Sequence, residues 1–161
     1  MRLLLSTIMS LFALVAAAQS ESDFAQTYMR IYAADGQLTC NTIGPSMIQQ
    51  MLTLDEVEAD KEATAALKKI KSLRIVGKPD GKVGEAEFDN ALKLLQANDE
   101  RYKLYEEYDE KCLYVRKKGD VFVELVLLLK ENPTLLIDIT GNMTEKFVGD
   151  LMGERSTEKP S

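Results

Sequence analysis

Two apolar runs joined by a short polar turn dominate the hydrophobic pattern of the chain. Residues 121–140 read VFVELVLLLKENPTLLIDIT, and the Lys-Glu-Asn-Pro turn separates two strand-length segments. The first segment is apolar on both of its faces: Val121, Val123, Leu125, Leu127 and Leu129 alternate with Phe122, Val126 and Leu128. A strand that is apolar on both faces is typical of the middle of a sheet. The pattern therefore predicts that this hairpin is the central pair of strands.

Periodicity predicts the other elements. Strand-length runs are expected at 38–43, 70–76, 102–108 and 111–117, and helices at about 22–34, 45–52, 84–97 and 143–152. Short turns link the four runs between 102 and 140, which forces antiparallel neighbours. We expect Gly141-Asn142 to end the last strand. The fold class is α+β, a single antiparallel sheet with a C-terminal β-meander and helices packed mainly on one face.

The first residues predict export. Arg2 precedes an apolar or small-residue run that ends in Ala16-Ala17-Ala18, the pattern of a secretory signal peptide cleaved after Ala18. The run is shorter than the roughly 20 residues of a spanning helix, so no membrane insertion is expected after cleavage. We divide the chain into a signal peptide (1–18), a single α+β domain (19–153) and a flexible tail (154–161).

Charge and cysteine content limit the partners and the covalent links that the chain is expected to have. The net charge of −6 makes a nucleic-acid partner unfavourable, because an acidic surface repels phosphate. Cys40 and Cys112 are the two cysteines. In an exported chain they either form a disulfide or remain as two buried thiols, and the sequence leaves both alternatives open.

Candidate chemistry is sparse. The chain has no histidine, which removes the commonest general base and metal ligand, and no cofactor is expected. Glu124 and Asp138 interrupt apolar strands on the side opposite the continuous apolar row, so they are expected on a partly exposed face or at the rim of a polar pocket. The residues of that face form the candidate partner surface: Phe122, Glu124, Val126, Leu128 and Asp138. A hydrolase that uses these carboxylates or a tyrosine pair is the enzymatic alternative.

Residues 80–88, DGKVGEAEF, are similar to the second half of an EF-hand calcium loop. Glu87 would be the bidentate ligand, but the first two ligand positions fall on Val76 and Lys78. Neither residue supplies an oxygen ligand, so a plain turn before a helix is the favoured interpretation. A weak calcium response remains an alternative.

The meander carries a family resemblance. Residues 114–120 (YVRKKGD), 124–129 (ELVLLL) and 135–141 (LLIDITG), followed by an amphipathic helix, resemble the family of domain of unknown function 4252. The resemblance implies an exported envelope protein of Bacteroides-type bacteria without an established activity. We expect a non-enzymatic binding or interaction module with an unknown protein partner or with self-association.

Overall fold

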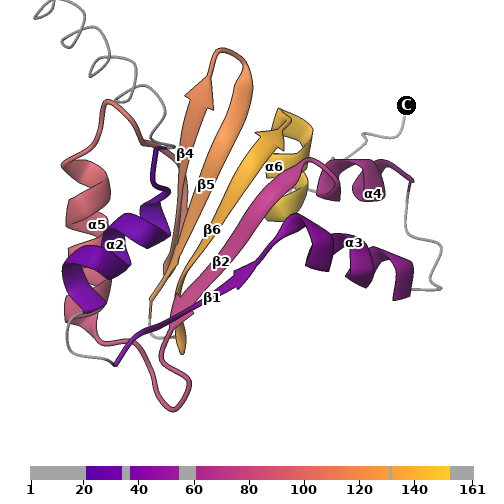
Figure 1. The fold of residues 1–161 in the computed structure, drawn as a ribbon. Coiled ribbons are helices and arrows are strands. Elements are labelled where there is room, and N and C mark those ends of the chain that lie inside the picture. Colours follow the sequence, from indigo (N-terminus) through magenta and orange to yellow (C-terminus); the bar gives the residue numbers. More distant parts are fainter. Residues whose placement is uncertain (1–20, 34–36, 55–60, 131, 153–161) are drawn as a thin grey trace, which may run out of the picture.

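The computed structural model describes residues 21–33, 37–54, 61–130 and 132–152. One open sheet of six strands forms its centre, in the order β1-β2-β6-β5-β4-β3, and every neighbouring pair is antiparallel (Figure 1). The described strands are β1 (Thr39–Ile43), β2 (Ile70–Gly77), β3 (Lys103–Tyr108), β4 (Lys111–Lys118), β5 (Val121–Leu129) and β6 (Thr134–Met143). The described helices are α2 (Phe24–Tyr32), α3 (Pro45–Leu54), α4 (Lys61–Leu67), α5 (Glu85–Gln96) and α6 (Glu145–Met152).

The predicted fold class is confirmed. β5 and β6 are the two middle strands of the sheet, as their apolar pattern indicated, and β3 to β6 form the meander. β2 pairs with β6, so the N-terminal part of the chain extends the sheet on the side opposite β3. The signal peptide and the C-terminal tail predicted from sequence lie outside the described residues.

The helices cover the two faces of the sheet unequally. α2 and α5 lie on one face, which we call the α2 face, and supply six buried core residues: Phe24, Ala25, Tyr28, Phe88, Ala91 and Leu95. α3, α4 and α6 lie toward one end of the opposite face (Figure 1). Among their described side chains, Val148 alone is buried. Helix packing is therefore concentrated on the α2 face, as expected.

A bulge in β5 changes the face of one predicted partner residue. The register of β5 against β6 shifts between Phe122 and Glu124, and the register against β4 shifts opposite the same place. A bulge adds one residue to one strand and so reverses the alternation of side chains beyond it. Phe122 therefore packs in the opposite core with Leu125 and Tyr105, whereas Val126 and Leu128 belong to the α2 face.

The predicted end of the last strand is wrong. β6 continues through Gly141 to Met143, and Gly141 pairs with Ile70 of β2. A Cβ atom on Gly141 would lie 3.0 Å from the Cα atom of Ile70. This glycine permits a close approach of two strands, and the sequence pattern mistook it for a turn residue.

Both cysteines are free thiols in the structure. They lie in one cross-strand row, in which Cys40, Val76, Leu136, Leu128 and Cys112 succeed one another on β1, β2, β6, β5 and β4. Four strand spacings of about 4.8 Å place them roughly 19 Å apart. A disulfide needs Cα atoms within about 7 Å, so this fold favours two thiols over the intramolecular bridge that the sequence left open.

Candidate functional site

The N-terminus of α2 docks on two carboxylates of the sheet. The backbone N–H of Phe24 donates to Glu124 Oε1 at 2.6 Å, and the N–H of Ala25 donates to Asp138 Oδ2 at 2.7 Å. The first N–H groups of a helix lack intrahelical partners, and the helix dipole places partial positive charge there. Two central-strand carboxylates are therefore paired with the helix that covers them.

Asp23 completes this end of α2. It occupies the N-cap position, and its Oδ1 accepts from the N–H of Gln26 at 2.9 Å. Its Oδ2 accepts from Arg74 Nε of β2 at 2.7 Å, and Arg74 Nη1 donates to Thr42 Oγ1 of β1 at 2.7 Å. The cap thus joins α2 to the two strands at one side of the sheet.

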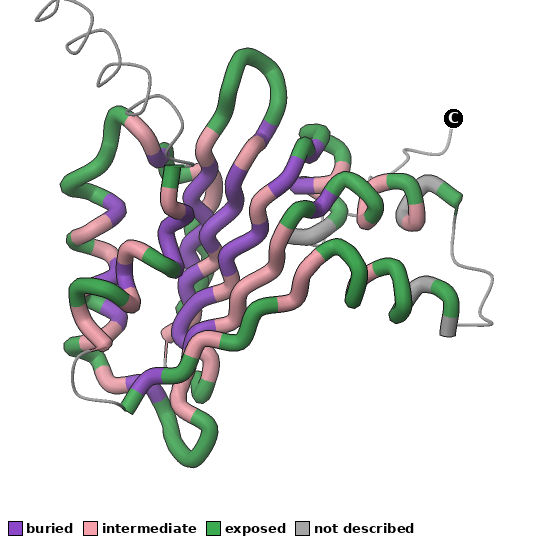
Figure 2. The backbone as a smooth tube through the Cα atoms, viewed as in Figure 1, coloured by how far each residue is buried: buried purple, intermediate pink, exposed green. Residues whose placement is uncertain are grey.

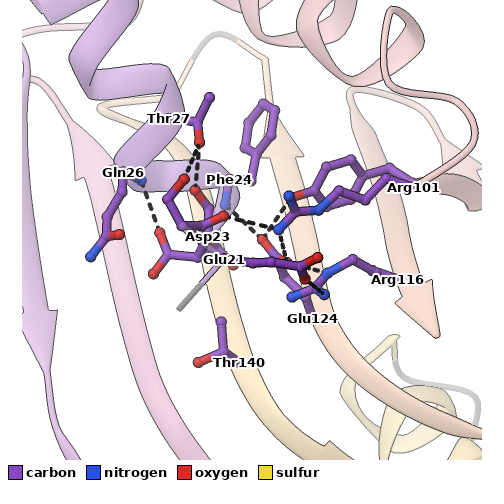
Figure 3. A network of polar contacts seen from close by, with 12 residues as sticks. Glu21, Asp23, Phe24, Gln26, Thr27, Arg101, Arg116, Glu124 and Thr140 are labelled. Carbon is purple, nitrogen blue, oxygen red and sulfur yellow. Dashed lines mark hydrogen bonds and ion pairs between the residues drawn. The ribbon is translucent and has the colours of Figure 1, made fainter. Parts of the chain in front are cut away.

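Both carboxylate oxygens of Glu124 accept hydrogen bonds. Besides Phe24, the hydroxyl of Tyr102 donates to Oε1 at 3.0 Å, and Arg116 Nε on β4 donates to Oε2 at 2.7 Å. Arg116 Nη1 also contacts Glu21 Oε2 at 2.9 Å (Figure 3). Burial and the neighbouring Glu124 raise the pKa of Tyr102 above its usual range, which keeps the phenol protonated as a donor.

Asp138 is less completely satisfied. The side chain has no solvent exposure, and its Oδ1 lacks a hydrogen-bond partner among the described residues. Burial, followed by the charge of Glu124, raises the pKa of Asp138 well above its usual range, although the Ala25 N–H and Arg74 oppose the shift. The structure thus favours the protonated form of Asp138.

Asp138→Asn is expected to become progressively more stable than the wild-type chain as the pH rises. A folded-state pKa above the unfolded value of about 3.9 means that Asp138 stabilises the fold below that value and loses this contribution as the pH passes the folded pKa. Asparagine cannot ionise and still offers an oxygen to the Ala25 N–H. Urea unfolding of both proteins from about pH 4 upward measures the difference. Asp89→Asn, at an exposed position of α5, is the control, and a difference for Asp138→Asn that is constant with pH would contradict the expectation.

The candidate partner surface predicted from sequence is buried by the chain's own helices. Phe122, Glu124, Val126, Leu128 and Asp138 all have side chains with essentially no solvent exposure. The expectation that the two carboxylates lie on a partly exposed side is wrong, because they dock α2 instead. A substrate could not reach them without the departure of this helix.

The calcium-loop candidate and three of the four tyrosines between residues 102 and 114 also have structural roles. Glu87, the would-be calcium ligand, forms an ion pair with Lys78, and Lys78 is the main cause of the lowered pKa of Glu87. Tyr102 and Tyr114 are buried on the α2 face, and Tyr105 packs edge-on against Phe122. Tyr108 is 66% exposed at the end of β3. No group of three metal-ligating side chains occurs among the described residues.

A small cavity of about 150 Å³ lies on the opposite face, between α4, α6 and the adjoining ends of β2 and β6. Lys69, Asn142 and Thr144 supply its polar side chains, and Ala65, Ala66, Met143 and Phe147 complete the lining. No carboxylate lines this cavity, so it is separate from the α2 network.

The exposed surface that stands out is one that the hydrophobic pattern did not reveal. Residues 37–54, which we call the uncharged segment, contain no charged residue in a chain that is 29% charged, although a stretch of this length would average about five charges. They form β1 and α3, and Leu38 is their one buried side chain among those described. Met47 and Met51 are 49% and 55% exposed. Counting charges along the sequence would have found this segment.

Low charge, exposed methionines and an open strand edge are features of protein interfaces. Figure 2 shows β1 and the described residues of α3 in the colours of exposed and intermediate residues. The uncharged segment is therefore the candidate functional site on the surface, whereas the carboxylate network serves the fold.

Comparison with known proteins identifies a family. A family model described as "Domain of unknown function (DUF4252)" matches residues 32–151. No curated protein and no solved structure matches the chain. Among the described residues, no helix is long and apolar enough to cross a membrane.

Proposed function

The chain belongs to the DUF4252 family, and from this premise we propose that it is an exported, non-enzymatic interaction module that binds a protein through the uncharged segment. Because the family carries no established activity, the proposal rests on the chain's own surface. The carrying observation is that residues 37–54 contain no charge, while their described side chains, apart from the buried Leu38, are exposed or half-buried. Charged residues are depleted and methionine is enriched at the centre of protein interfaces, so this surface has the composition of one that a partner covers.

Burial of the polar groups supports a non-enzymatic role. The candidate acid and base groups, Glu124 and Asp138, have no solvent exposure and are engaged with the first turn of α2. Acid–base catalysis requires a group within hydrogen-bond reach of the substrate. Export is part of the proposal because the first residues have the signal-peptide pattern, with cleavage after Ala18.

Site-specific photo-cross-linking tests the proposal. A photoreactive residue at Met47 or Met51, placed in the chain in cells of the native host, is expected to give a discrete cross-linked protein species in the exported fraction. The same group at Tyr108, which is more exposed but lies at the other edge of the sheet, is the matched control. Intact mass of the recovered chain reports cleavage after Ala18. Equal cross-linking at Tyr108, or none at the α3 positions, would contradict the assigned surface.

A further inference from the structure

The two edges of the sheet differ in their protection against pairing. β3 carries Lys103, Glu106 and Glu107, and its register against β4 is broken between Leu104 and Glu106. Charges and bulges are the usual devices by which edge strands avoid association. β1 has neither device: its sequence is TCNTI, and its register against β2 is unbroken from Thr39 to Ile43. Of the two edge strands that the structure describes, only β1 is both regular and uncharged.

We propose that two copies of this chain pair antiparallel through their β1 edges and form one continuous sheet. This inference rests on the proposed function, since it names the partner of the uncharged segment. Every neighbouring strand in the sheet is antiparallel, so a symmetric β1 pair continues the same alternation. Such a contact uses the same patch on both copies and closes after two subunits.

The sequence of β1 is compatible with itself across a two-fold axis. A pair centred on Asn41 uses all five residues of the strand. Asn41 then faces Asn41 of the second copy, Thr39 faces Ile43, and Cys40 faces Thr42. No like charges meet in this register, and residues such as threonine and isoleucine are favourable in cross-strand pairs.

Charge also favours a second copy over a strand of another protein. Two chains of net charge −6 repel each other, and like charges brought together at an interface weaken association. A self-contact is therefore tolerated best where the contacting segment has no charge, which is the property of residues 37–54. A foreign strand would be selected by complementary charges or side-chain pockets, and β1 presents no charge for that purpose. The exposed methionines of α3 directly follow β1 and enlarge the apolar surface available to the second copy.

Introducing a charge at Asn41, the residue on the two-fold axis, tests the inference. Asn41 is exposed, so Asn41→Lys and Asn41→Glu are each compatible with the folded chain. Sedimentation equilibrium of the purified wild-type protein is expected to give a dimer. Each variant alone places two like charges face to face and is expected to weaken dimerisation at least about tenfold. An equimolar mixture is expected to restore a dimer that contains one copy of each variant.

The mixture also separates loss of pairing from loss of folding, because misfolded variants would not recover on mixing. Tyr108→Lys, at the other edge, is the control and is expected to leave the dimer unchanged. A monomeric wild-type protein, or variants that dimerise as well as the wild type, would overturn the inference. If the wild type is monomeric while Met47 and Met51 cross-link to a different protein, the proposed function stands and the second-copy assignment fails.

Discussion

Replacement of Glu124 by alanine is expected to lower the free energy of unfolding by about 3–5 kcal/mol, the cost of removing one partner of a buried ion pair. Glu124 has no solvent exposure and accepts from the Phe24 N–H, the Tyr102 hydroxyl and Arg116 Nε. Alanine leaves all three donors without this acceptor, and the guanidinium of Arg116 is itself largely buried. Urea unfolding monitored by circular dichroism measures the effect.

Two further variants define what Glu124 contributes. Glu124→Gln retains an oxygen for Phe24 and Tyr102 but places an NH₂ group opposite the Arg116 Nε–H, so it is expected to recover only part of the loss. Glu110→Ala, at an exposed position of the β3–β4 turn, is expected to change stability by less than about 0.5 kcal/mol. If Glu124→Ala resembled Glu110→Ala, the carboxylate would not be the anchor of α2.

The elements that the sequence predicted well are those whose signal is local. The apolar alternation of β5 and β6 required burial on both faces, and the turns of the meander required antiparallel neighbours. The face of Phe122 and the end of β6 were missed because both depend on a partner strand. A bulge is defined against its neighbour, and the role of Gly141 is visible only beside Ile70.

The polar network was predicted in part. Glu124 and Asp138 were singled out because each interrupts an apolar strand, but periodicity assigned them to an exposed side. Their partners on α2 are 100 and 113 residues away in the chain. In the sequence of a strand, a buried carboxylate and a solvent-facing one look alike, because each is a polar residue among apolar ones. Whether the carboxylate is buried depends on hydrogen-bond donors from a distant segment, which the strand sequence does not contain.

The uncharged segment was missed for a different reason, because its distinguishing feature is the absence of charged residues. Periodicity correctly placed a short strand and a helix there, but it considers only where apolar residues fall. The absence of charge concerns the outer surface, and it acquires meaning only once β1 is known to be an edge strand and α3 to be exposed.

Phe24→Ala is expected to destabilise the protein by about 3–5 kcal/mol, the usual cost of removing a buried phenylalanine ring. Phe24 is 2% exposed, and its ring meets the ring of Tyr102 edge-on at 5.7 Å and that of Tyr28 at 6.2 Å. Urea unfolding is again the measurement. Ile31→Ala, in the same helix but at a position that is 48% exposed, is the control, with an expected loss below about 1 kcal/mol.

The double variant Phe24→Ala, Glu124→Ala decides whether the ring and the carboxylate act as one docking unit. Phe24 supplies both the ring that fills the core and the N–H that Glu124 accepts, and Tyr102 contacts both groups. Once either single change has released the first turn of α2, the second has less structure left to disrupt. The combined loss is therefore expected to fall short of the sum of the single losses by about 0.5–3 kcal/mol. Strict additivity would mean that the ring and the carboxylate stabilise the fold independently and do not form one docking unit.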